Sequence, residues 1–184
     1  MQNQVNKPAA RARIAVSAAA LAAAGAGMFG ALATGPAAAA PAGPKAETTT
    51  STDHLTVDAA VDAAQAALDA AEKEGQRVTV AVVDRNGNTI VTLRGDGAGP
   101  QSYESAVRKA YTSAAWNAPT SQLAERLKSA PNLKDIPHTL FLAGGAPITH
   151  RNAPIAGIGV AGAPSGDLDE KFARAGVTAV SRGR

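Results

Sequence analysis

The segment that decides the fold is Val80–Pro100, which reads VAVVDRNGNTIVTLRGDGAGP. It includes most of two runs rich in β-branched residues, Val78–Val83 and Thr89–Leu93. Asn86-Gly87 lies between them, and this pair favours a hairpin turn because both residues tolerate a positive φ. Asp84 begins the turn, where its carboxylate can accept backbone N–H groups. The segment therefore predicts an antiparallel β-hairpin.

Two further apolar blocks end in glycines. The first is Thr139–Ile148 (TLFLAGGAPI) and the second is Ile155–Glu170 (IAGIGVAGAPSGDLDE). An apolar run that is bounded by turn residues is typical of a strand. We therefore predict strands over His138–Ala143 and Ile155–Ala161, with a turn at Gly144-Gly145.

Helical periodicity appears before the hairpin and directly after it. From Thr56 to Glu74 apolar residues recur every three or four positions, and Gly75 provides a stop. The residues of this apolar stripe are Val57, Val61, Ala64, Leu68 and Ala71. A second helix is predicted over Ser102–Trp116, with Ser102 as its N-cap.

Two more helices are predicted in the second half of the chain. A short one follows Pro119 and is capped by Thr120 or Ser121, and residues 131–137 form a loop. The last helix begins near Asp167, which forms a capping box with Glu170 three residues later. These elements predict an α/β (α+β) class fold for residues 55–184, a compact domain with a largely antiparallel sheet flanked by helices.

The first 40 residues have the pattern of a secretory signal. They contain Lys7, Arg11 and Arg13, no acidic residue, an apolar run of small residues, and several A-x-A cleavage options. Residues 41–54 are rich in Pro and Thr and predict a flexible linker. We expect a protein secreted to the extracellular space after cleavage.

Charge and cysteine content narrow the function further. Without the three cations of the leader, basic and acidic residues are equal in number. The composition therefore argues against a nucleic-acid partner, which would need a basic surface. The chain has no cysteine, which excludes thiol catalysis and thiolate ligands. Neither a G-x-S-x-G elbow nor a phosphate-binding loop is present, and we predict no catalytic residue.

The three blocks, in this order and with SYESAVRKAYTSAAW (Ser102–Trp116) between the first two, resemble the GlcG/HbpS-like haem-binding family. The likeness extends from about Leu55 to Val180. It implies a compact fold that assembles into a homo-octamer, haem b bound non-covalently, and redox sensing through a membrane sensor kinase.

The apolar block around Phe141 offers a wall for haem, which needs an apolar slot and one or two axial ligands. In a strand, Thr139 and Phe141 would share one face and His138 the other. The resemblance associates the threonine with haem, so Thr139 is the first candidate and His138 the alternative. Of the other two histidines, His150 lies in a polar turn and is expected to face solvent.

The resemblance also implies a site for iron ions, at an acidic pair on the helix after the hairpin together with a histidine near the start of the domain. Glu104 and His54 stand at these positions. Val107 occupies the second acidic position, so the pair is incomplete here.

The leading hypothesis is thus a secreted haem-binding protein that captures haem or iron and reports redox stress. The alternatives are a haem-degrading enzyme and a module that binds a small metabolite.

Overall fold

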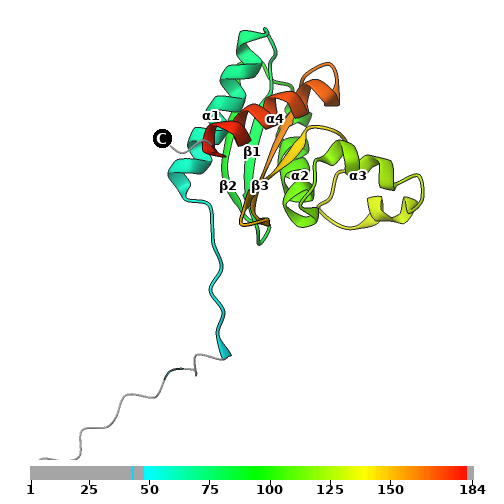
Figure 1. Ribbon diagram of the computed structural model, residues 1–184. Coiled ribbons are helices and arrows are strands. Elements are labelled where there is room, and N and C mark those ends of the chain that lie inside the picture. Colours follow the sequence, from blue (N-terminus) through cyan, green and yellow to red (C-terminus); the bar gives the residue numbers. More distant parts are fainter. Residues whose placement is uncertain (1–42, 44–47, 182–184) are drawn as a thin grey trace, which may run out of the picture. The chain divides into compact units, whose positions relative to one another are not determined.

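A computed structural model describes residue 43 and residues 48–181, and the folded part is a four-stranded sheet with helices on both faces (Figure 1). The predicted leader, residues 1–40, lies outside the described residues, as do parts of the predicted linker, residues 41–54. Residues 49–56 form neither helix nor strand. Each helix within residues 48–181 is too short or too polar to span a bilayer.

The sheet is antiparallel throughout, in the order β2-β1-β4-β3. This arrangement confirms the predicted fold class. The strands are β1 (Thr79–Asp84), β2 (Thr89–Arg94), β3 (Gly145–His150) and β4 (Ala153–Ala161). The predicted hairpin is confirmed, with β1 paired to β2.

Asp84 performs the structural role that the sequence predicts. Its carboxylate accepts the N–H groups of Asn86 and Asn88 at 2.8 and 2.9 Å. Partial burial raises the pKa of Asp84, but the hydrogen bonds from Asn88 and Asn86 outweigh it, so the pKa is lower than usual. The ionised carboxylate therefore holds the turn.

Helices α1 (Val57–Lys73) and α4 (Gly166–Ser181) cover one face of the sheet and pack against each other. The N-cap of α1 is Thr56, and the buried face of the helix is made of alanines. Val57 and Val61 were predicted to face the core and are instead 61% and 43% exposed. Alanine brings the helix close to the sheet, whereas Val57 and Val61 are not among the residues that pack on the core.

The opposite face of the sheet is covered by α2 (Pro100–Trp116). The predicted N-cap at Ser102 was wrong: Gly99 is the N-cap and Pro100 opens the helix. Pro at the first helical position loses no hydrogen bond because that N–H has no partner in the helix. Ser102 lies in the first turn and is buried, where its hydroxyl shares a hydrogen bond with Thr79.

Helix α3 (Thr120–Arg126) and the 3₁₀ helix η2 (Pro131–Asp135) form a small lobe beside α2. Pro119 is the N-cap of α3, so Thr120 and Ser121 do not cap it. The hydroxyl of Thr120 instead accepts the N–H of Gly145 at 2.7 Å. The predicted loop at residues 131–137 is mostly η2.

The predicted strand His138–Ala143 was wrong. These residues form no strand, and β3 begins only at Gly145, where a turn was expected. Side chains replace the sheet ladder: the hydroxyl of Thr112 accepts the N–H of Leu140 at 2.7 Å. Phe141 packs on Trp116 with ring centroids 5.3 Å apart, so the apolar run belongs to the α3 lobe.

The predicted capping box at the start of α4 was also wrong. Asp167 lies inside the helix, and the hydroxyl of Ser165 accepts the N–H of Leu168 at 3.2 Å. The two acids that follow bind other helices. Asp169 forms a buried ion pair with Lys109 of α2 at 2.8 Å, and Glu170 accepts the Ser121 N–H at 3.0 Å.

Candidate functional site

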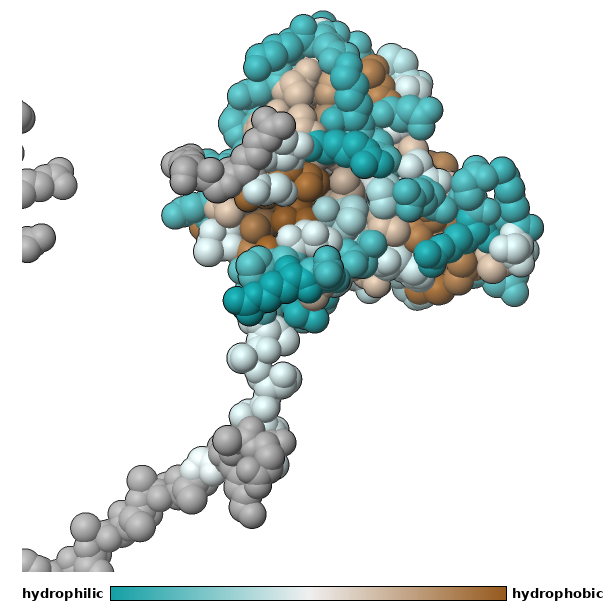
Figure 2. All heavy atoms as spheres, in the orientation of Figure 1, coloured by the Kyte–Doolittle hydropathy of each residue, from teal (hydrophilic) through white to brown (hydrophobic). Residues whose placement is uncertain are grey.

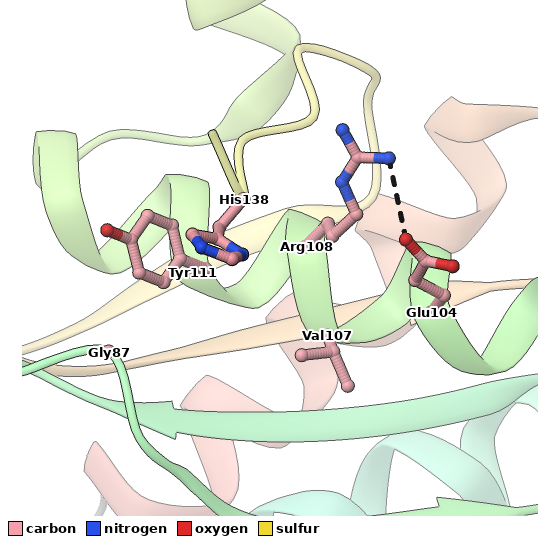
Figure 3. A pocket seen from close by; sticks show the side chains of 6 residues that line it. All are labelled: Gly87, Glu104, Val107, Arg108, Tyr111 and His138. Atoms are coloured by element: carbon pink, nitrogen blue, oxygen red, sulfur yellow. Dashed lines mark ion pairs between the residues drawn. The ribbon is translucent and has the colours of Figure 1, made fainter. Parts of the chain in front are cut away.

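A hollow of about 550 Å³ lies along the outer side of α2, and we call it the α2 groove. Its volume lies within the range of sites for small ligands and cofactors. It is open to solvent and runs between the turn of the β1–β2 hairpin and the loop after η2. Its lining residues are Gly87, Glu104, Val107, Arg108, Tyr111 and His138 (Figure 3).

The spacing of the helical residues creates the groove. Glu104, Val107, Arg108 and Tyr111 are separated by three or four positions and so share one side of α2. The sequence pattern pointed to Glu104 and Val107 but not to Arg108 and Tyr111. Extending this stripe along the predicted helix would have found them.

Tyr111 forms one end of the groove, against the hairpin turn. Gly87 has φ +91°, and a Cβ atom there would lie 2.7 Å from Cε2 of Tyr111. Glycine at this position thus serves the turn and also lets the ring approach the backbone. The hairpin turn therefore packs against the ring that closes one end of the groove.

His138, on the loop after η2, lies beside Tyr111 in the groove (Figure 3). Its φ is +66°, which costs a residue with a Cβ atom roughly 1 kcal/mol. Its ring lies 6.0 Å from that of Tyr111, centroid to centroid, at an interplanar angle of 58°. The imidazole is exposed, and its ring makes no hydrogen bond to any of the residues that the structure describes. An imidazole held in this way is available to an external ligand.

Arg108 joins α2 to the loop that carries His138. Its Nη2 donates a hydrogen bond to the carbonyl oxygen of Thr139 at 2.7 Å. Its Nη1 lies 3.8 Å from Oε1 of Glu104, as drawn in Figure 3. The groove therefore contains a cation beside an imidazole and a phenol.

The other predicted haem contacts do not line the groove. Thr139 is 1% exposed, and its hydroxyl donates to the carbonyl oxygen of Ile136 at 2.7 Å. Phe141 is buried in the α3 lobe. Because residues 138–143 are not a strand, the opposition of His138 and Thr139 across two strand faces does not exist. Thr139 as a haem contact stays a prediction of the resemblance.

The structure places the predicted iron ligands in different surroundings. Glu104 lines the groove. His54 instead hydrogen-bonds Thr52 at 3.0 Å and lies near enough to Asp84 to help lower the pKa of that carboxyl group. Among residues 48–181 no group of three or more His, Asp or Glu side chains could hold a metal ion. An iron site at His54 and Glu104 stays a prediction.

His150, expected in a polar turn, ends β3. It is exposed, as predicted, and its Nε2 lies 3.8 Å from a carboxylate oxygen of Asp53. It is not among the residues that line the groove, which makes it a suitable control for His138.

The sheet, the helices on both faces and the groove along α2 define a small α+β domain with a site for a ligand on the outer side of one helix. The chain belongs to the family described as haem degrading protein HbpS-like, whose model matches residues 55–178.

Solved structures agree with this assignment. The chain is 66% identical to a double mutant of Streptomyces reticuli HbpS in which two glutamates are replaced by aspartates, with a TM-score of 0.75 over 80% of this chain and 99% of that one. It is also 66% identical to HbpS in a second structure, with a TM-score of 0.74 over 78% and 100% of the two chains. A PduOC–haem complex shares the fold at 24% identity, with a TM-score of 0.63 over 69% and 95% of the two chains. No curated protein matches the chain significantly.

Proposed function

We propose that this protein binds haem non-covalently in the α2 groove. One observation carries the proposal: the imidazole of His138 lines a cavity of about 550 Å³ and makes no hydrogen bond to the residues that the structure describes. Imidazole is a common axial ligand of haem iron. The family's description and the haem bound by a relative of the same fold support the same ligand.

The residues present suit the chemistry of haem. Val107 and the ring of Tyr111 provide apolar contact, and Arg108 provides a cation for a propionate. The chain has no cysteine for a thioether link, which fits the non-covalent, exchangeable haem b that we propose. Iron bound in the groove would supply redox chemistry, and the protein would position the porphyrin.

We also propose that the protein is secreted after loss of residues 1–40 and reports redox stress to a membrane sensor kinase. The composition of the leader supports secretion. The resemblance to the family supports the sensing role. An exposed groove with one side-chain ligand suits a carrier or sensor that exchanges haem.

The test is a haem titration of the mature chain, followed at the Soret band. His138→Gly should raise the dissociation constant about tenfold or more, because it removes the ligand at a position where glycine adopts the positive φ freely. His150→Ala is the control and should bind like the parent.

Thr139→Ala is included because the resemblance names that residue. If it weakens binding and His138→Gly does not, the iron is held as the resemblance implies and the imidazole is not the ligand. If all three variants bind like the parent, haem lies outside the groove and the proposal is wrong.

Haem degradation is a second candidate, because the family description names it. Turnover distinguishes the two: with reductant and oxygen, a degrading enzyme would lose its Soret band in repeated cycles, whereas a carrier would retain the porphyrin. If the parent does not bind haem at all, the small-metabolite alternative takes precedence.

A further inference from the structure

Arg108 uses its two terminal nitrogens in different ways. Nη2 donates to the Thr139 carbonyl at 2.7 Å, a normal hydrogen-bond distance, and so fixes the loop beside His138. Nη1 faces Glu104 at 3.8 Å, which is beyond hydrogen-bond distance. One nitrogen is thus committed to the fold, and the other has only a loose partner.

The surroundings make the second contact replaceable. The side chain of Glu104 is 79% exposed and that of Arg108 is 38% exposed. An ion pair at such an exposed surface contributes little to stability or binding. A carboxylate that reached Nη1 directly would form a charge-assisted hydrogen bond and bind better than Glu104 does.

We infer that the groove recognises its ligand by a carboxylate on Arg108, and that Glu104 is a competing counter-ion that lowers the affinity. Glu104 is thus a specificity-determining residue. In the free protein it lies beside the guanidinium, and an acidic ligand displaces it. This inference rests on the proposed function, since the ligand class is a planar porphyrin with carboxylate side chains.

The competition has a direct consequence for selectivity. A ligand with a carboxylate gains affinity from its contact with Arg108, but part of that gain is lost because the contact between Arg108 and Glu104 must be broken. A ligand whose carboxylates are esterified gains nothing from Arg108 and leaves the Glu104 contact intact. Only ligands of the first kind should respond to removal of the Glu104 charge.

The experiment uses metal-free protoporphyrin and its dimethyl ester, both followed by porphyrin fluorescence, so that iron ligation by His138 plays no part. Glu104→Gln should bind the diacid about two- to fivefold more tightly at low salt, and the gain should shrink as ionic strength rises. Affinity for the ester should not change.

Two matched variants complete the design. Glu125→Gln removes the acid of another exposed surface pair, formed with Lys128 just after the end of α3, and should bind both porphyrins like the parent. In an Arg108→Gln background, Glu104→Gln should no longer tighten binding, because the contested cation is absent.

Three outcomes would overturn the inference: no gain in Glu104→Gln, an equal gain for the ester, or a gain that persists without Arg108. The last would mean simple repulsion by the Glu104 charge. Failure of the proposed function is separate, since it would appear as a parent protein that does not bind haem in the titration at the Soret band.

Discussion

At the scale of single residues, Glu170 shows how a local pattern can mislead. Three residues after Asp167, it matches a capping box, yet it accepts the N–H and the hydroxyl of Ser121 at 3.0 and 2.9 Å and pairs with Arg174 at 2.7 Å. Ser121 lies 49 positions earlier in the chain. A pattern confined to four residues contains no information about that partner.

The network predicts an acid dependence of stability. Burial raises the pKa of Glu170, but the hydrogen bonds from Arg174 and Ser121 outweigh it and hold the pKa below the usual 4.5. The ionised form therefore stabilises the fold above pH 4.5, and this contribution is lost as the pH falls through the lowered pKa.

Glu170→Gln should lower the free energy of unfolding at neutral pH by about 1–3 kcal/mol, because it leaves charged and polar partners poorly satisfied. The stability of this variant should also fall less than that of the parent as the pH is lowered, because the titrating carboxylate is gone. Urea unfolding across a pH series measures both effects. Glu125→Gln is the control and should shift stability by less than about 0.5 kcal/mol. If the acid decline is as steep in Glu170→Gln as in the parent, the Glu170 network does not cause it.

At the scale of elements, α2 and β4 depend on small residues at their contact. A Cβ atom at Gly159 would lie 2.1 Å from the carbonyl oxygen of Ala106, and one at Gly157 would lie 2.2 Å from that of Ala110. Helix and strand therefore meet backbone to backbone. The opposite side of α2 lines the groove, so this contact also positions the site.

Gly159→Ala should destabilise the protein by about 3 kcal/mol, because the added methyl meets backbone that cannot give way easily. It should also weaken porphyrin binding by displacing α2. Gly75→Ala is the matched control: its Cβ would meet nothing within 4 Å, and only its φ of +69° opposes the change. That variant should cost about 1 kcal/mol and bind normally. Equal losses of stability and binding in the two variants would contradict this account.

The elements also show what the sequence could predict. The hairpin was predictable because Asn86-Gly87 encodes its own turn. Helix α1 was predictable because its periodicity extends over five turns. The run Thr139–Leu142 looks like a strand, but its backbone bonds to the side chains of Thr112 and Arg108, which lie 28 and 31 positions from their partners in the chain. Such side-chain partners leave no local signal, so the loop and its effect on His138 could not be predicted.

At the scale of the whole molecule, we predict that the mature chain assembles into a homo-octamer. The prediction comes from the resemblance to the family. Figure 2 shows apolar surface over α1, where Val57 and Val61 are exposed, and such patches often mark contacts between proteins. Sedimentation of the mature chain at micromolar concentration tests the prediction, and a species of monomer mass alone would refute it.

The position of Trp116 at the end of α2 has a practical consequence for the binding measurements. The chain has one tryptophan, and it ends the helix that lines the groove. Tyr111 lies five positions before it, which is about 7–8 Å along a helix. The emission of Trp116 overlaps the Soret absorption of porphyrins, so a porphyrin in the groove would quench it by energy transfer. The protein therefore has a built-in optical reporter, which can follow ligand exchange in real time without a label.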